Sequence, residues 1–193
     1  MVALSDRILM SAEEYLAWEL TQQERHEFWD GEVVLMAGGT KRHNRISGNC
    51  FKVLDGLLAD RDCEVYITDV KVQVEANRKY FYPDVMVTCD GRDGDTQIVQ
   101  YPCLIVEVLS DSTEAVDRGA KFTYYRRFET LREYVLIQQE RPMVEVFCRN
   151  DMGKWVLTEY GSGDVIDLES LGCQIAVVDL YDRVVFDAIE DGD

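Results

Sequence analysis

The spacing of apolar residues in the first third of the chain predicts two helices with a hairpin between them. Ser11 with Glu14 three positions later fits a capping box, so a first helix is expected from Ala12 to about Gln23. The pair Asp30-Gly31 in "RHEFWDGEVVLMAGG" is a turn signal between two apolar runs and predicts a hairpin. A second helix is expected from about Asn44 to Ala59, where apolar residues recur at helical spacing. These residues are Ile46, Cys50, Val53, Leu54 and Leu57.

The middle of the chain changes to the patterns of strands. The segment "CEVYITDVKVQV" alternates with a period of two, and Asn77 and Arg78 turn it into the strand that carries Asp84. The continuous apolar run "YPCLIVEVLS" is typical of a buried central strand, and it contains Glu107. Helical character returns from Thr113 to Phe128.

Three further strands are expected in "REYVLIQ", "MVEVFCRN" and "KWVLTEY", followed by a short strand and a terminal helix around Asp179 to Val185. No repeat, linker or low-complexity tract interrupts the 193 residues. This order predicts an α/β (α+β) protein, with one domain over residues 1–193 and a central mixed sheet flanked by helices.

The composition predicts a compact cytoplasmic protein. Hydrophobic residues make up 47% of the chain, and no segment has the character of a signal peptide or a membrane span. The six cysteines are scattered without Cys-x-x-Cys spacing, so we expect them to be reduced residues of the core. They are Cys50, Cys63, Cys89, Cys103, Cys148 and Cys173.

The net charge of −17 disfavours long-range attraction of nucleic acid. Affinity for a phosphate backbone rests mainly on Lys and Arg, which displace counterions. Any nucleic-acid site on this chain must therefore work against the field of the whole protein.

Two carboxylates and one lysine form the most informative group in the sequence. Glu107 lies inside an apolar strand, where a buried carboxylate needs a neighbouring cation. The strands that carry Asp84 and Glu107 can lie side by side, and Lys121 on the following helix can fold back toward them. Taken alone, Asp84 after a proline is more often a turn residue, so its interpretation depends on this grouping.

An Asp, a Glu and a Lys can together hydrolyse a phosphodiester bond with a divalent metal ion. Carboxylates hold Mg²⁺ or Mn²⁺, which offsets charge on the phosphate and lowers the pKa of a bound water. A lysine then orients that water or stabilises the transition state.

Three segments carry a resemblance to a known family. Together "YPDVMV", "PCLIVEVLS" and "DRGAKFTYYRRFETLREYVLI" resemble the family of putative restriction endonucleases long known as a domain of unknown function, within the PD-(D/E)XK nuclease superfamily. The resemblance covers nearly the whole chain. It implies a restriction-endonuclease-like fold and a metal-dependent endonuclease acting on DNA.

The resemblance also implies roles for individual residues. Asp84 and Glu107 match the two motif acids and would bind the metal with the backbone carbonyl of Val108. The usual motif lysine is absent, because Leu109 stands at its position, and Lys121 resembles a lysine that has moved to the next helix. Asp117 and Tyr125, four residues before and after Lys121, match the spacing of the family.

Two residues of the N-terminal half are additional candidates. The superfamily often supplies one more acid from this region, and Glu32 after the predicted turn could be that acid or a solvent-exposed hairpin residue. His43 could contact a metal-bound water or a phosphate, or it could simply be solvated at the start of a helix.

Three hypotheses remain open from the sequence. The first is a metal-dependent DNA endonuclease that forms a homodimer, as restriction-type nucleases commonly do. The second is a weakly active or inactive nuclease fold that serves as a protein-interaction or regulatory module, and the negative charge favours it. The third is a sugar hydrolase that uses Asp84 and Glu107 as acid and base, which leaves Lys121 without a role.

Overall fold

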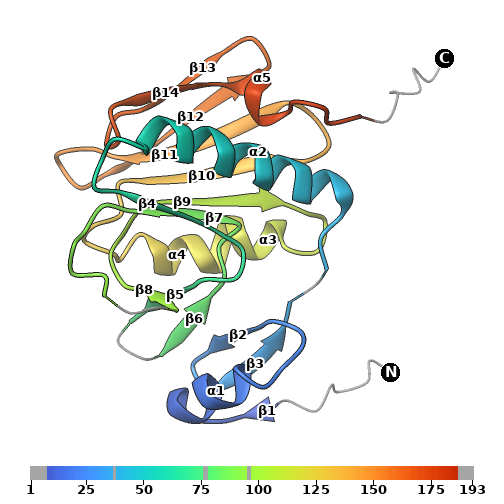
Figure 1. Ribbon diagram of the computed structural model, residues 1–193, viewed down its shortest axis with the longest axis vertical. Coiled ribbons are helices and arrows are strands. Elements are labelled where there is room, and N and C mark those ends of the chain that lie inside the picture. Colours follow the sequence, from blue (N-terminus) through green and yellow to red (C-terminus); the bar gives the residue numbers. More distant parts are fainter. Residues whose placement is uncertain (1–7, 37, 76–77, 95–96, 187–193) are drawn as a thin grey trace.

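The computed structural model describes residues 8–36, 38–75, 78–94 and 97–186, and it contains the central mixed sheet that the sequence predicts (Figure 1). The strand order of this sheet is β12-β11-β10-β9-β7-β4. Strands β9 and β10 are parallel, and the other neighbours are antiparallel. The strands are β4 (Glu64–Ile67), β7 (Val85–Thr88), β9 (Pro102–Leu109), β10 (Glu133–Gln138), β11 (Met143–Arg149) and β12 (Trp155–Gly161).

A second sheet and a hairpin extend the structure at its two ends. The second sheet has the order β1-β3-β2-β6-β5-β8 and contains the predicted hairpin at Asp30-Gly31. The C-terminal hairpin pairs β13 with β14. The bounds are β1 (Ile8–Leu9), β2 (His26–Trp29), β3 (Glu32–Leu35), β5 (Lys71–Val74), β6 (Lys79–Phe81), β8 (Ile98–Val99), β13 (Val165–Leu168) and β14 (Cys173–Ala176).

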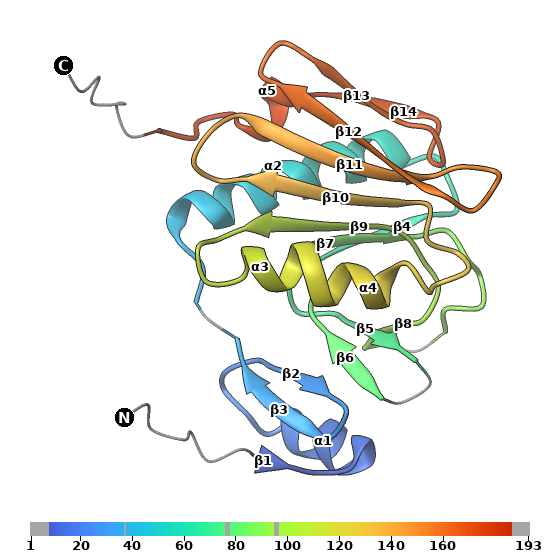
Figure 2. The same cartoon turned by 180° about the vertical axis from the view of Figure 1, so that it is seen from behind.

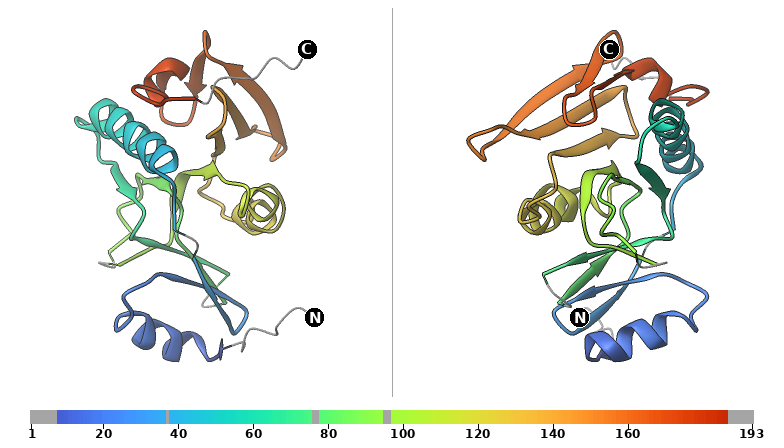
Figure 3. Two further views of the ribbon diagram at one scale, coloured as in Figure 1. Left: turned by 90° about the vertical axis from the view of Figure 1, so that its right-hand side faces the viewer. Right: turned by 60° about the vertical axis from the view of Figure 1, so that its left-hand side comes forward.

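Helices cover both faces of the central sheet (Figures 2 and 3). One face packs against the apolar stripe of α2, and the other packs against the segment α3–η1–α4, in which η1 is a π-helical turn. The helices are α1 (Ala12–Glu19), α2 (Lys41–Leu58), α3 (Glu114–Val116), η1 (Asp117–Lys121), α4 (Phe122–Tyr125) and α5 (Val177–Leu180). None of the helices in the described ranges combines the length and apolar character that crossing a bilayer requires.

Capping residues set where the first two helices begin. The predicted capping box is present at α1, where Ser11 and Glu14 exchange hydrogen bonds, although the helix ends at Glu19 rather than near Gln23. Helix α2 begins at Lys41, earlier than expected, because the Thr40 hydroxyl accepts a hydrogen bond from the His43 amide at 3.0 Å. His43 therefore lies within the first turn of α2.

Several predicted boundaries were wrong. The alternating segment 63–74 is divided between β4 and β5, which belong to different sheets, and Thr68 between them has a positive φ of 55°. Such a backbone bend leaves no mark in a period-two pattern. Strand β8 was not predicted, and the C-terminal region forms a hairpin followed by the single turn α5.

The expectation that all cysteines are reduced was also wrong. Cys63 and Cys89 form a disulfide. They flank the antiparallel pair β4–β7, in which Glu64 lies opposite Thr88, so one further step of the register brings the two cysteines together. Sequence spacing could not indicate this pair, because 26 residues separate its members.

Candidate active site

The register of two adjacent strands brings Asp84 and Glu107 together. Val85 of β7 lies opposite Val106 of β9, and one step further along this antiparallel pair puts Asp84 across from Glu107. Asp84 Oδ2 accepts a hydrogen bond from the Val108 amide at 2.7 Å. Asp84 sits just before β7 and keeps 15% side-chain exposure, whereas Glu107 is buried. The two acids therefore meet at one end of the strand pair, as the sequence suggested.

Lys121 lies directly against Glu107. Its ammonium donates a hydrogen bond to Glu107 Oε1 at 3.2 Å, and the Tyr125 hydroxyl donates to the same oxygen at 3.0 Å. Asp117 Oδ1 is 3.3 Å from the Lys121 ammonium. All three helical residues are buried, and the π-helical turn that holds two of them is a feature that often occurs at functional sites.

The hairpin contributes an acid that the sequence reasoning missed. Glu27 Oε1 of β2 lies 2.9 Å from the Lys121 ammonium, and Glu27 Oε2 accepts a hydrogen bond from the Trp29 indole at 3.1 Å. The predicted Glu32 is on the neighbouring strand β3. Glu27 precedes the buried Phe28, and a carboxylate in an apolar strand was the signal that had identified Glu107.

His43 faces Asp84 from the first turn of α2. Its Nε2 is 3.2 Å from Asp84 Oδ2. Burial alone would lower the pKa of His43, but the hydrogen bond and charge of Asp84, together with a hydrogen bond to the Val108 backbone, raise the pKa above its ordinary value. His43 thus contacts Asp84 in the candidate active site and is not a fully solvated residue.

The Lys121 ammonium and the three carboxylates around it, those of Glu27, Glu107 and Asp117, form the Lys121 cluster. This cluster holds an excess of negative charge. Burial raises the pKa of Glu107 well above its ordinary value despite the neighbouring Lys121, and the surrounding acids raise it further. Burial likewise raises the pKa of Asp117. Burial would lower the pKa of Lys121, yet its carboxylate neighbours outweigh that effect and raise it. Glu27 Oε1 and Asp117 Oδ1 are buried, and the Lys121 ammonium is the cation beside both of them, at 2.9 and 3.3 Å.

The donor set fits a hard divalent cation. No three His, Cys, Asp or Glu side chains in the described ranges are grouped as a complete metal site. Mg²⁺, however, is commonly bound through only one or two carboxylates, with water and substrate oxygens completing its coordination. Asp84, Glu107 and the Val108 carbonyl offer oxygen ligands of this kind. A cation there would also offset the surplus carboxylate charge.

Comparisons with known proteins give a family match over most of the chain. Residues 12–178 match the sequence model of Uma2, described as a putative restriction endonuclease family. The uncharacterized protein slr1290 of Synechocystis is 42% identical over 92% of this chain and 94% of its own length. A second uncharacterized Synechocystis protein, sll1609, is 37% identical over 82% of this chain and 91% of its own length.

A solved structure shares the fold. The crystal structure of a putative nuclease belonging to DUF820 from Anabaena variabilis superposes with a TM-score of 0.74, covering 91% of this chain and 99% of that one. The sequence identity is 13%. The predicted fold class, a mixed sheet flanked by helices in a nuclease-like arrangement, is confirmed.

Proposed function

Because this chain belongs to the Uma2 family of putative restriction endonucleases, we propose that it is a metal-dependent endonuclease that hydrolyses phosphodiester bonds in DNA. The observation that carries the proposal is the contact between Glu107 and Lys121, with Asp84 across the strand pair from Glu107. Two carboxylates that can hold a divalent ion, with a lysine beside them, suit metal-assisted phosphodiester hydrolysis.

In this proposal Asp84, Glu107 and the Val108 carbonyl hold Mg²⁺ or Mn²⁺. When bound, the ion supplies charge stabilisation at the phosphate and a water of lowered pKa. The Tyr125 hydroxyl and the Lys121 ammonium both donate to Glu107 Oε1, so the orientation of this carboxylate is fixed before a ligand arrives.

Lys121 supplies the positive charge that the reacting phosphate or water needs. The charges of Glu107, Glu27 and Asp117 raise the pKa of Lys121 against the effect of burial, which keeps it protonated at neutral pH. Asp117 is itself held in place, because its backbone carbonyl accepts a hydrogen bond from the Tyr134 hydroxyl at 3.0 Å. Glu27 and Asp117 therefore act as positioning residues for the Lys121 ammonium.

His43 contacts the acid that would bind the metal. In its neutral form the imidazole can accept a hydrogen bond from a metal-bound water, and in its protonated form it can donate to a phosphate. Because a protonated His43 and a divalent cation both interact with Asp84, metal affinity is expected to rise as His43 loses its proton.

The direct test is cleavage of plasmid and single-stranded DNA with Mg²⁺, Mn²⁺ or EDTA. We expect products with either metal, none with EDTA, and none from the Asp84→Ala variant. A wild-type protein that leaves both substrates intact with both metals would exclude the endonuclease proposal.

The alternative function is an inactive nuclease fold used as a protein-interaction or regulatory module. The net charge of −17 favours it, because this charge opposes recruitment of DNA. This alternative predicts that Mg²⁺ stabilises the protein or has no effect, but that no DNA is cut. Turnover on DNA separates the two functions.

A homodimer in the cytoplasm remains a prediction. Strand β12 is at the edge of the central sheet and exposes Val156 and Leu157, which is consistent with a second copy pairing there. Light scattering at micromolar concentration tests this. A mass of 22.2 kDa, that of one chain, would contradict the dimer.

A further inference from the structure

A hollow lies at the opposite end of β9 from the candidate active site. It has a volume of about 310 Å³ and is lined in part by Tyr101 and Phe128, which flank β9 and α4 in the sequence. Glu107 lies six residues after Tyr101 along an extended chain, so the two places are separated by roughly 20 Å. None of the residues that surround Lys121 lines this hollow.

Two glutamine amides form one side of the hollow. Strands β5 and β8 are parallel, with Val72 opposite Val99, and the residues that follow these two, Gln73 and Gln100, both line the hollow. Gln73 donates a hydrogen bond to the Tyr80 hydroxyl at 3.2 Å, whereas the amide group of Gln100 has no hydrogen-bond partner among the described residues. A glutamine amide offers both donors and an acceptor, and it is a side chain that binds the edge of adenine.

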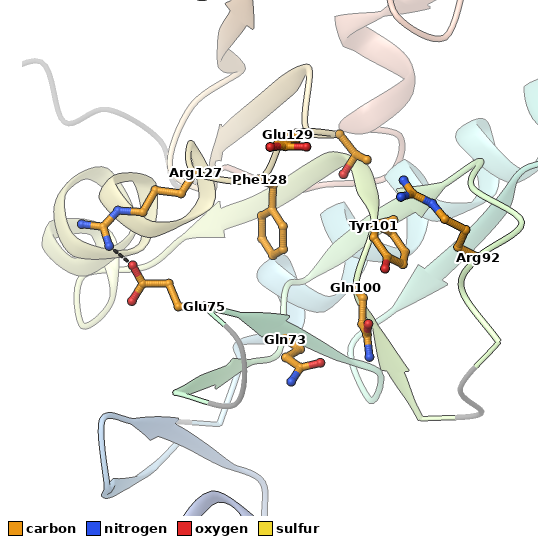
Figure 4. Close-up of a pocket in the computed structure, with 9 residues that line it drawn as sticks. Gln73, Glu75, Arg92, Gln100, Tyr101, Arg127, Phe128 and Glu129 are labelled. Carbon is orange, nitrogen blue, oxygen red and sulfur yellow. Dashed lines mark ion pairs between the residues drawn. The ribbon is translucent and has the colours of Figure 1, made fainter.

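Two aromatic rings form the other walls. In Figure 4 the ring of Phe128 projects into the hollow between Arg127 and Tyr101, and the amides of Gln73 and Gln100 lie on the side below it. Phe128 is half-buried and packs against the core of the sheet, which holds its ring in place. The half-exposed ring of Phe128 beside two amide groups suits a flat, polar-edged ligand such as an unpaired nucleobase.

Two arginines stand at the rim. The guanidinium of Arg92 lies 4.0 Å from the centroid of the Tyr101 ring and is paired with Asp90, and Arg127 is paired with Glu75. The side chains of Arg92 and Arg127 are 63% and 53% exposed. A guanidinium has five N–H donors, so those that do not face Asp90 or Glu75 can donate to the phosphates that flank a bound base.

We propose that the hollow formed by Gln73, Gln100, Tyr101 and Phe128 binds an unpaired purine base of a nucleic-acid strand. The inference rests on the proposed function for its choice of a nucleic-acid ligand. If its bases stay stacked at about 3.4 Å per nucleotide, a strand of about six nucleotides would reach from this base to Glu107. The hollow would thus hold the substrate at a distance from the bond that is cut.

The test measures binding without cleavage. A single-stranded oligonucleotide that contains 2-aminopurine, a fluorescent adenine analogue, is titrated with protein in EDTA, and both fluorescence and anisotropy are recorded. We expect quenching on binding by the wild type, and an affinity lowered about tenfold or more by Phe128→Ala or Gln100→Ala. Phe128→Tyr, which keeps the ring, should retain the affinity.

Controls separate binding from folding. Gln100 is exposed, so Gln100→Ala is not expected to disturb the core, and Gln174→Ala on β14 removes another exposed glutamine far along the chain. Gln174→Ala should bind like the wild type, and thermal melts check that every variant is folded. Equal affinity of folded Gln100→Ala, folded Phe128→Ala and wild type would overturn the proposal.

Two further measurements identify the source of the base and the independence of this site. Adenosine monophosphate is tested as a competitor, and binding of the free nucleotide but not of the oligonucleotide would overturn assignment to a strand. Failure of the wild type to cut DNA, with base binding intact, would remove the proposed function and leave this site. Cleavage of DNA by the wild type, together with equal base binding by the wild type, Phe128→Ala and Gln100→Ala, would support the proposed function and overturn the base-binding site.

Discussion

Lys79 and Lys121 are both buried against carboxylates, but their surroundings differ in charge. The Lys79 ammonium lies 2.7 Å from Asp30 and 3.0 Å from Glu75, and 4.1 Å from the centroid of the Tyr124 ring. Arg78 and Arg127 also pair with these two acids. These residues form the Lys79 cluster, which has three cations for two carboxylates. Lys121, in contrast, is a single ammonium among Glu27, Glu107 and Asp117.

The pKa shifts have opposite directions in the two clusters. A hydrogen bond from Lys79 lowers the pKa of Asp30, which is the behaviour of a satisfied ion pair. Burial raises the pKa values of Glu107 and Asp117 beside Lys121. We infer that the Lys79 cluster stabilises the fold, and that the Lys121 cluster retains unfavourable charge that a bound cation would offset.

The largest expected difference is in catalysis. Lys121→Ala should lower the rate of DNA cleavage by about a hundredfold or more, because it removes the charge that acts on the water or the transition state. Lys79→Ala should leave the rate within a few-fold and lower the free energy of unfolding by about 1 kcal/mol through its ion pairs, because Asp30 is 40% exposed and both acids keep an arginine partner. Rates are measured below the melting temperature of each variant.

Lys121→Arg is the charge-preserving control for this comparison. Folded Lys121→Ala protein that cuts at the wild-type rate would remove Lys121 from the active site. Asp84 and Glu107 would then remain as a metal-site hypothesis without a catalytic lysine.

The second difference concerns metal binding. Mg²⁺ or Mn²⁺ at a hundred times its dissociation constant should raise the free energy of unfolding by about 2.7 kcal/mol. The Asp84→Ala, Glu107→Ala double variant should lose this response, and Asp30→Asn in the Lys79 cluster should keep it. Thermal melts or calorimetry can measure the effect. An equal metal response in the wild type and the double variant would exclude metal binding at these acids.

The third difference is the pH dependence of stability in EDTA. Glu107 has a folded-state pKa above its ordinary value of 4.5, so the folded protein binds more protons than the unfolded chain in this range. Stability should therefore fall as pH rises from 4.5 through the raised pKa of Glu107. Asp30 has a lowered pKa, so its contribution is present above its ordinary value of 3.8 and is lost as pH falls through the lowered pKa.

Urea denaturation from about pH 5 to about pH 8 separates these contributions. Glu107→Gln should flatten the decline in stability, and Asp30→Asn should leave the decline unchanged. His43, whose pKa is raised, adds a contribution that is lost as pH rises through that pKa, and the His43→Gln variant removes it. A decline as steep in Glu107→Gln as in the wild type would contradict the assignment to Glu107.

The comparison also explains which parts of the site could be predicted. Glu107 and Lys121 were recognisable because a carboxylate inside "CLIVEVL" demands a cation, and a helix with a lysine follows in the chain. Glu27 was missed because its contact with Lys121 joins the second sheet to the helix that covers the central sheet. Packing between such distant segments leaves no periodic pattern in the sequence.

The same limit applies to the rest of the fold. The central strands follow from local hydrophobic patterns, and β9 was recognised as a continuous apolar run. The disulfide between Cys63 and Cys89 and the positive φ at Thr68 depend on strand register and on a bend between two sheets. Neither is determined by residues that are close in sequence.

The smallest expected effect is that of Asp117→Asn. An exposed ion pair between Asp117 and Lys121, four residues apart on a helix, would contribute about 0.3 to 0.5 kcal/mol. Both residues are buried, however, and Lys121 keeps Glu27 and Glu107 when Asp117 becomes neutral. Removing one of three carboxylates also reduces the surplus negative charge, so we expect a change in the free energy of unfolding of less than about 1 kcal/mol, with stabilisation favoured.

The control is Glu114→Gln, which breaks the more exposed pair with Arg118 on the same helical segment. A loss above about 3 kcal/mol in urea denaturation of Asp117→Asn would show that all three carboxylates are needed to hold Lys121, and the Lys121 cluster would then stabilise the fold, as we infer for the Lys79 cluster.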